Sequence, residues 1–110
     1  IHVMDLANAH VVALERLLEN TSNANYDVFN LGTGKGNSVL EVINTFEDVT
    51  GQKLAYTMAD RREGDITAAY ADTDRANNVL NWKAEHDLEQ ALKSAWNWEK
   101  KVAEKEVQED

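Results

Sequence analysis

The sequence contains no cysteine and no proline among its 110 residues. Without cysteine there are no disulfides and no thiolate metal sites, and nothing indicates an oxidising compartment, so we expect a cytoplasmic protein. No apolar run approaches the roughly 20 residues that cross a bilayer. The first residues also lack the basic and apolar regions of a signal peptide. We therefore expect no membrane partner, and no Pro-rich linker divides the chain.

Positive charge is scarce, with 11 Lys and Arg against 20 Asp and Glu, which gives a net charge of -9. Such a balance repels nucleic acid and anionic surfaces unless a local patch overrides it. We expect no nucleic-acid partner, and any anion site must be local. The length fits one domain. We assign it to residues 1–102, followed by a charged tail at 103–110 that is expected to fray.

Four helices are predicted, each opening at a side chain that can cap free backbone N–H groups. The expected caps, in chain order, are Asp5, Ser38, Asp72 or Thr73, and Asp87. The first helix is expected to end near Asn20, the second at Gly51 and the third at Leu80. Apolar spacing places Trp98 on the packed stripe of the last helix.

Aromatic and branched residues at 26–31, alternating apolar residues at 54–58 and the run at 68–71 predict short strands. Together with the helices they predict an α+β fold of about four helices and a few short strands. Glycines at 32, 34 and 36 follow the first strand and imitate a dinucleotide-binding loop, but Asn37 stands where the third glycine of G-x-G-x-x-G belongs. The alternative is a turn whose glycines permit positive backbone dihedrals.

His2, His10 and His86 are too scattered to indicate a metal site, and structural or surface roles suit them better. The most informative cluster is Ala-Asp-Arg-Arg-Glu-Gly-Asp at 59–65. Planar guanidinium groups bind phosphate oxygens through two hydrogen bonds at once, so these arginines suit a phosphate group. The alternative is a solvated loop in which the arginines pair with neighbouring acids, an arrangement that is common and weak.

Four runs, at residues 1–7, 29–34, 38–42 and 61–65, resemble in the same order the C-terminal part of the UDP-glucose 4-epimerases. The resemblance continues through 71–72, 80–82 and the last helix, so it covers essentially the whole chain. These enzymes are extended short-chain dehydrogenase/reductases, with an N-terminal Rossmann domain that holds NAD and a smaller domain that grips the UDP-sugar. The resemblance implies the substrate domain, without the Rossmann core, of an enzyme that interconverts UDP-galactose and UDP-glucose through a 4-keto intermediate.

The resemblance also implies roles for four residues. Arg62 matches the arginine that contacts the UDP diphosphate, and Asp65 matches the aspartate that holds the nucleoside. Independently, a guanidinium can neutralise diphosphate and a carboxylate can accept from ribose hydroxyls. Val39 matches a position close to the nucleotide. Ala69 is small where a bulky residue would restrict the sugar pocket, which implies tolerance for N-acetylated UDP-sugars.

Catalytic parts of that family are missing from this sequence. There is no G-x-x-G-x-x-G motif, and none of the three tyrosines is followed four residues later by lysine. The family's catalytic Tyr and Lys and its NAD site therefore lie outside this chain. The sequence begins without Met, just after the position of the family's Arg-Asp-Tyr, so we expect a fragment. It should be inactive alone, because the reaction needs both a hydride acceptor and a general base.

Without the Rossmann sheet, the strand at 26–31 would lose its neighbour and leave backbone groups unpaired. We therefore expect a dimer, in which this segment pairs with that of a second copy or the two copies exchange elements. Two other functions remain open: the same domain of another nucleotide-sugar enzyme, such as a dehydratase or decarboxylase, and a non-catalytic interaction module.

Overall fold

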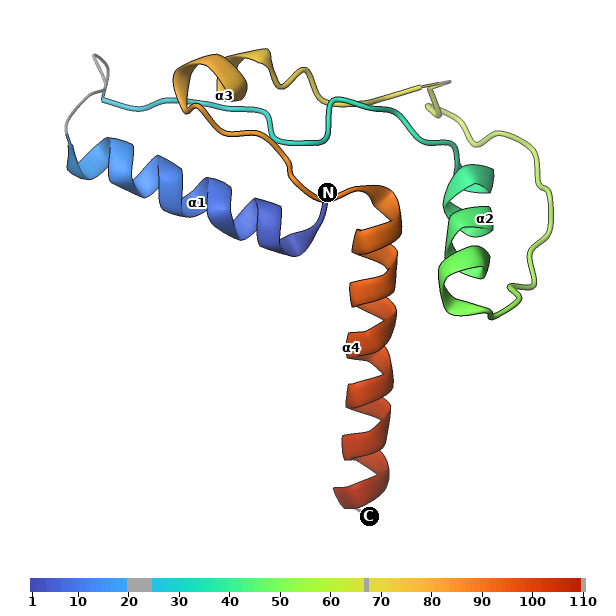
Figure 1. Ribbon diagram of the computed structural model, residues 1–110. Helices are drawn as coiled ribbons and strands as arrows, with labels where there is room; N and C mark the ends of the chain where they lie inside the picture. The colour runs from blue at the N-terminus through green and yellow to red at the C-terminus, as the bar shows by residue number, and fades with distance from the viewer. Residues whose placement is uncertain (20–24, 67, 110) are drawn as a thin grey trace. The chain divides into compact units, whose positions relative to one another are not determined.

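The computed structural model describes residues 1–19, 25–66 and 68–109, and these contain four helices (Figure 1). They are α1 (Val3–Leu18), α2 (Val39–Thr50), α3 (Asp74–Val79) and α4 (Leu88–Glu109). No strand occurs in these described residues, so the predicted α+β class with a few short strands is wrong and the chain is mainly helical. The helix α4 extends to Glu109.

The strand predictions fail because alternation of apolar residues favours extended backbone but does not supply a hydrogen-bonded neighbour. Residues 26–31 and 54–58 belong to no ladder in the described part of the chain. Several of their large side chains are exposed, since Tyr26, Tyr56 and Met58 are 78%, 54% and 73% exposed. An isolated strand without packing on one face gains little stability in water.

The chain divides into two compact units, each built from two separate segments. The first contains Ile1–Gly36 and Ala68–Asp87, and therefore α1 and α3. The second contains Asn37–Thr67 and Leu88–Asp110, and therefore α2 and α4. Among the described residues, no helix combines the length and the apolar character that a membrane span requires.

The core of the first unit is formed by α1, α3 and the residues that follow α3. Ala9, Ala76, Leu80 and Trp82 are buried there. The partly buried apolar residues that pack against them are Val12, Phe29, Leu31 and Ala84. In Figure 1, the segment that carries Phe29 and Leu31 runs between α1 and α3. Packing of this kind, rather than a sheet, holds the segment in place.

The start of α1 differs from the prediction. Its N-cap is His2, whose Nδ1 accepts a hydrogen bond from the Met4 backbone N–H at 3.0 Å. The expected cap, Asp5, lies inside the first turn and is only 3% exposed. Its carboxylate is bonded to His86, which is 81 residues away in the sequence. Asp5 therefore bonds to His86 instead of capping α1, and the local sequence pattern does not indicate this distant partner.

The glycine-rich segment at 32–36 packs against residues 70–73 of the same unit. A Cβ added to Gly32 would lie 3.1 Å from the Cβ of Ala71, and one added to Gly36 would lie 3.4 Å from the ring of Tyr70. Gly34 has a φ of 77°, which side chains of L-residues rarely permit. Close approach and a positive φ both support the interpretation of this segment as a turn.

In the second unit, α2 packs against α4. The rings of Phe46 and Trp96 meet edge to face, with centroids 5.5 Å apart and planes at 81°. This geometry is favourable for aromatic pairs. Trp98 is 63% exposed, so its predicted place on the packed stripe is wrong. The tryptophan that contacts α2 is instead Trp96, on a different face of α4.

Both ends of α2 agree with the prediction. The hydroxyl of Ser38 accepts a hydrogen bond from the Glu41 backbone N–H at 3.1 Å, as an N-cap should. Gly51 ends the helix with a φ of 71°. Thr73 precedes α3 as its N-cap residue. These boundaries are local features, and the sequence alone indicates them.

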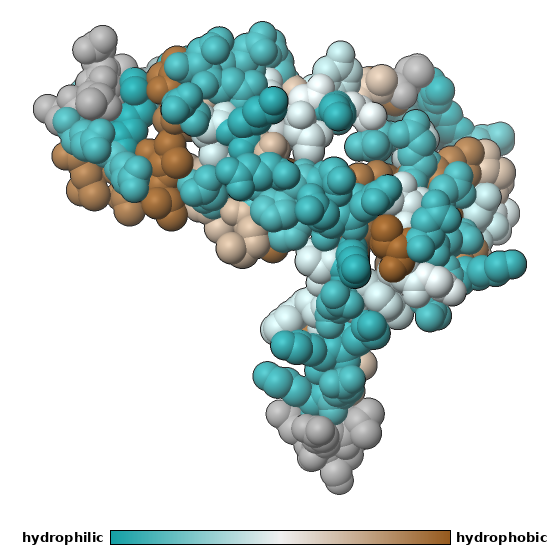
Figure 2. Space-filling view, in the orientation of Figure 1, coloured by the Kyte–Doolittle hydropathy of each residue, from teal (hydrophilic) through white to brown (hydrophobic). Residues whose placement is uncertain are grey.

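The surface of α1 is strongly apolar toward its C-terminal end (Figure 2). Leu14, Leu17 and Leu18 are 56%, 64% and 77% exposed. The residues of this helix that contribute to the core are Ala9 and Val12. Only part of the apolar surface of α1 is therefore used by the core of its own unit.

Candidate functional site

The segment at 62–65 forms a tight turn in the second unit. The backbone N–H of Asp65 donates to the carbonyl oxygen of Arg62 at 3.1 Å. Gly64 has a φ of 85°, in the left-handed region that glycine enters without steric cost. The glycine of the Arg-Arg-Glu-Gly-Asp run therefore lets the chain reverse, and the reversal brings the aspartate back to the arginine.

The carboxylate of Asp65 binds Arg62 twice. Its Oδ2 accepts from the backbone N–H of Arg62 at 2.9 Å and from the guanidinium Nε at 3.2 Å. The Arg62 side chain is nevertheless 87% exposed, whereas that of Asp65 is 36% exposed. In the described part of the chain, the hydrogen bonds of the guanidinium involve only Nε, which leaves both terminal nitrogens for a ligand.

An exposed ion pair of this kind contributes little to stability, typically about 0–1 kcal/mol. The pairing corresponds to the solvated-loop alternative, in which the arginines contact neighbouring acids. It is also compatible with anion binding, because a guanidinium has five N–H donors and Nε carries only one of them. The two terminal nitrogens form the edge that matches phosphate oxygens.

The other two predicted site residues lie apart from this turn in the sequence. Val39 is the first residue of α2, in the same unit as the turn, and is 76% exposed. Ala69 is exposed and belongs to the other unit. The structure thus joins Arg62 to Asp65 directly, and it places Val39 and Ala69 on separate segments.

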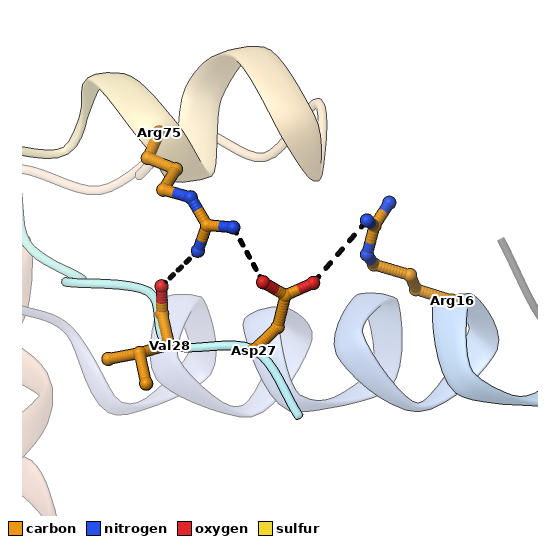
Figure 3. Close-up of polar contacts among 4 residues, drawn as sticks. All are labelled: Arg16, Asp27, Val28 and Arg75. Carbon is orange, nitrogen blue, oxygen red and sulfur yellow. Dashed lines mark hydrogen bonds and ion pairs between the residues drawn. The ribbon is translucent and has the colours of Figure 1, made fainter. Parts of the chain in front are cut away.

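Two further arginines are already engaged in the first unit (Figure 3). The carboxylate of Asp27 forms ion pairs with both arginines: its Oδ2 lies 3.4 Å from Nη2 of Arg16, and its Oδ1 lies 2.5 Å from Nη2 of Arg75. Arg75 also donates to the carbonyl oxygen of Val28, and its guanidinium carbon lies 4.5 Å from the centre of the Phe29 ring. Arg16 and Arg75 therefore tie α1, α3 and the segment between them together, which makes them structural rather than candidates for an anion site.

A second polar cluster joins the start of α1 to the segment before α4. Asp5 accepts from the His86 backbone N–H at 2.9 Å and from its Nδ1 at 2.8 Å. The ring of His2 stacks on that of His86, with centroids 4.3 Å apart. Burial by itself raises the pKa of the Asp5 carboxyl, but the hydrogen bonds from His86 and from the Glu85 backbone outweigh it and lower that pKa.

The scattered positions of the histidines in the sequence favour structural or surface roles but give no sign of this cluster. Its members, Asp5, His2 and His86, are brought together only by the fold, and no local spacing signals them. Among the described residues, no group of three or more His, Cys, Asp or Glu side chains is placed to hold a metal ion. The polar clusters of the first unit stabilise its fold, and the turn at 62–65 is the best candidate for ligand binding.

No family model matches the sequence. The UDP-glucose 4-epimerase GEPI48 of Cyamopsis tetragonoloba is 46% identical over 101 residues, which cover 92% of this chain and 28% of that protein. The UDP-glucose 4-epimerase of Bacillus subtilis (strain 168) is 46% identical over 99 residues, which cover 90% of this chain and 28% of that protein. This chain therefore spans about 28% of the length of such relatives, and it corresponds to their C-terminal part.

Two solved structures share the fold. The UDP-glucose 4-epimerase of Stenotrophomonas maltophila, with bound NAD and formylated UDP-arabinopyranose, is 41% identical with a TM-score of 0.86, over 94% of this chain and 30% of that one. The UDP-glucose 4-epimerase of Bifidobacterium longum, in complex with NAD+ and UDP, is 42% identical with a TM-score of 0.77, over 92% of this chain and 29% of that one.

Proposed function

This chain belongs to the UDP-glucose 4-epimerase family, and on that premise we propose that it is the part of such an enzyme that holds the UDP-sugar. The single observation that carries the proposal is the exposed guanidinium of Arg62, held through Nε within a tight turn. The diphosphate of UDP is the anion that this edge suits, and Asp65 offers a carboxylate for the ribose hydroxyls. The structures from S. maltophila and B. longum, which contain a UDP-sugar and UDP, support the choice of ligand.

In this proposal, the parent enzyme interconverts UDP-galactose and UDP-glucose with NAD, in the cytoplasm and in the metabolism of galactose. NAD is bound in both structural relatives. In the same proposal the cofactor is held by the rest of the parent enzyme, and the packing of the glycine-rich segment at 32–36 against residues 70–73 supports a structural role for these glycines. The sequence also lacks the family's cofactor loop and its Tyr-x-x-x-Lys motif. The contribution of this chain is therefore to bind and orient the nucleotide, not to transfer hydride or protons.

The sugar preference follows from Ala69 in the same proposal. Its methyl group leaves more room than a bulky residue would, so N-acetylated UDP-sugars are expected as additional substrates of the parent enzyme. Val39, exposed at the first residue of α2, is expected to lie beside the nucleotide. Both assignments rest on the family resemblance.

Replacing Arg62 with glutamine should weaken UDP binding by about 10- to 100-fold, because hydrogen bonds to charged groups contribute about 1.5–3 kcal/mol. Isothermal titration calorimetry of the chain with UDP measures this change. Arg61→Gln is the matched control, since it removes the same charge from the neighbouring residue, and its effect should stay below about threefold. Equal losses in the two variants would mean that net charge, and not the Arg62 contact, governs binding.

We also propose that the segment at 26–31 pairs with the same segment of a second copy. The exposure of Tyr26 and Val28, 78% and 67%, supports an accessible segment. The Val28 carbonyl already accepts from Arg75, so pairing must use the opposite edge, which carries the backbone groups of Phe29 and Leu31. Sedimentation equilibrium should therefore detect dimers at high protein concentration. A single monomeric species throughout would contradict the pairing.

A further inference from the structure

We infer that Asp65 is a positioning residue for Arg62, whose guanidinium it holds so that the terminal nitrogens are available to the diphosphate. The inference rests on the proposed function and deepens it. The resemblance gives Asp65 a role toward the nucleoside only. The structure adds a direct role toward the arginine, and therefore toward the opposite end of the ligand's UDP group.

Three hydrogen bonds link the same two residues. The Asp65 N–H donates to the Arg62 carbonyl at 3.1 Å, and the Arg62 N–H and Nε both donate to Oδ2 of Asp65, at 2.9 Å and 3.2 Å. Hydrogen bonds therefore hold Arg62 at its backbone and also at Nε of its guanidinium. Because the two residues are three positions apart, the turn fixes this geometry without help from other elements.

The second oxygen of the carboxylate, Oδ1, makes no hydrogen bond within the described part of the chain. Asp65 can therefore hold Arg62 through Oδ2 and still accept a ligand hydroxyl at Oδ1. The two roles do not compete for the same atom. Asp65 can thus contact Arg62 and a ligand hydroxyl at the same time.

Fixing a long side chain before binding reduces the rotamer entropy that the ligand would otherwise have to overcome. The side chain of Arg62 is 87% exposed, so without its bond to Asp65 it would sample many rotamers. Only a fraction of these rotamers would present the terminal nitrogens to a phosphate. Holding Nε removes most of these alternatives. Because the pairing is worth at most about 1 kcal/mol, we expect this preorganisation to raise the affinity for a diphosphate by up to about fivefold.

The sign of the effect separates positioning from simple electrostatics. Asp65 is an anion beside an anion site, so its charge alone opposes diphosphate binding, and removing it should tighten binding. Positioning predicts the reverse: binding weakens when Asp65 is removed, although a repulsive charge is lost with it. Glu63→Gln is the matched control, because it removes one negative charge from the same turn without touching the contacts of Arg62.

The test is a titration of the 110-residue chain with inorganic pyrophosphate, which contains the diphosphate and no ribose. Asp65→Asn should weaken binding by about threefold to fivefold relative to Glu63→Gln, and the same substitution in an Arg62→Gln background should not weaken it further. A parallel NMR measurement of the Arg62 Nε–H group should show a restrained side chain in the wild type and a mobile one in Asp65→Asn.

The possible failures are distinguishable. Pyrophosphate binding by Asp65→Asn as tight as that of Glu63→Gln, with the wild type still binding, would overturn the positioning role and leave the proposed function intact. An Arg62 Nε–H group that is equally mobile in wild type and Asp65→Asn would also overturn it. Absence of pyrophosphate binding by the wild type would overturn the proposed diphosphate contact and this inference together.

Discussion

Replacing Trp82 with alanine should lower the free energy of unfolding by about 3–5 kcal/mol. Trp82 is 2% exposed and packs in the core of the first unit with Ala9, Ala76 and Leu80. Two of these neighbours are alanines, which cannot fill the space that the indole would leave. The variant therefore loses both the burial of a large apolar surface and the contacts around the resulting cavity. Urea denaturation followed by circular dichroism measures the change.

Two variants make the Trp82 experiment specific. Trp82→Phe should cost much less than Trp82→Ala, because it keeps an aromatic ring and removes an indole Nε1 that has no hydrogen-bond partner among the described residues. Trp98→Ala should change stability by less than about 1 kcal/mol, since Trp98 is 63% exposed. A cost at Trp98 as large as that at Trp82 would contradict the core described here.

Replacing Asp5 with alanine should cost about 3 kcal/mol at neutral pH, because the change removes the buried carboxylate that accepts the hydrogen bonds from His86. Asp5 is 3% exposed, and both of its carboxylate oxygens are bonded to His86. Its removal leaves the His86 backbone N–H and ring N–H without their acceptor. It also detaches the first turn of α1 from the segment before α4.

The stability difference between wild type and Asp5→Ala should depend on pH in a definite direction. The pKa of Asp5 is lowered below 3.8 in the folded chain, so the folded state favours the charged carboxylate more than the unfolded state does. The stabilisation is therefore fully present above about pH 3.8 and is lost as the pH falls through the lower folded value. Urea denaturation at about pH 7, 4 and 3 should show the difference between the two proteins shrinking.

Asp48 provides the control for the pH experiment. It lies near the end of α2 and has no ion pair among the described residues, so Asp48→Asn should change stability little. A wild-type advantage over Asp5→Ala that persists unchanged at about pH 3 would mean that the charge of Asp5 is unimportant and that packing alone explains the loss.

Local sequence patterns predict the helices well, because a cap or stop signal acts on its nearest neighbours. Ser38 and Gly51 bound α2 where the sequence indicates. The turn at 62–65 is also accessible from sequence, since Arg62 and Asp65 are three residues apart and a glycine lies between them. The roles proposed for the arginine and the aspartate of this turn come from the family resemblance, because composition and spacing alone favour a solvated loop as much as an anion site.

Contacts between distant residues are not predictable in this way. The pairing of Asp5 with His86 joins residues 81 positions apart, and that of Asp27 with Arg75 spans 48. The first displaces Asp5 from the capping role that its local pattern favours. The strand predictions fail similarly, because the extended character of a segment is local but its hydrogen-bonded neighbour is not. Trp98 is misassigned because apolar spacing identifies an apolar face of α4 but does not show whether another element packs on that face.

An NMR titration of the 15N-labelled chain with UDP tests directly whether the turn at 62–65 binds the nucleotide, because the shifted resonances locate the ligand on the sequence. We expect the largest shifts at the backbone amides of 62–65 and at Nε–H of Arg62, with smaller shifts at Val39. Arg62→Gln should suppress them. Shifts confined to α1 or α3, or no shifts at millimolar UDP, would contradict the assignment of the turn at 62–65 as the nucleotide-binding site.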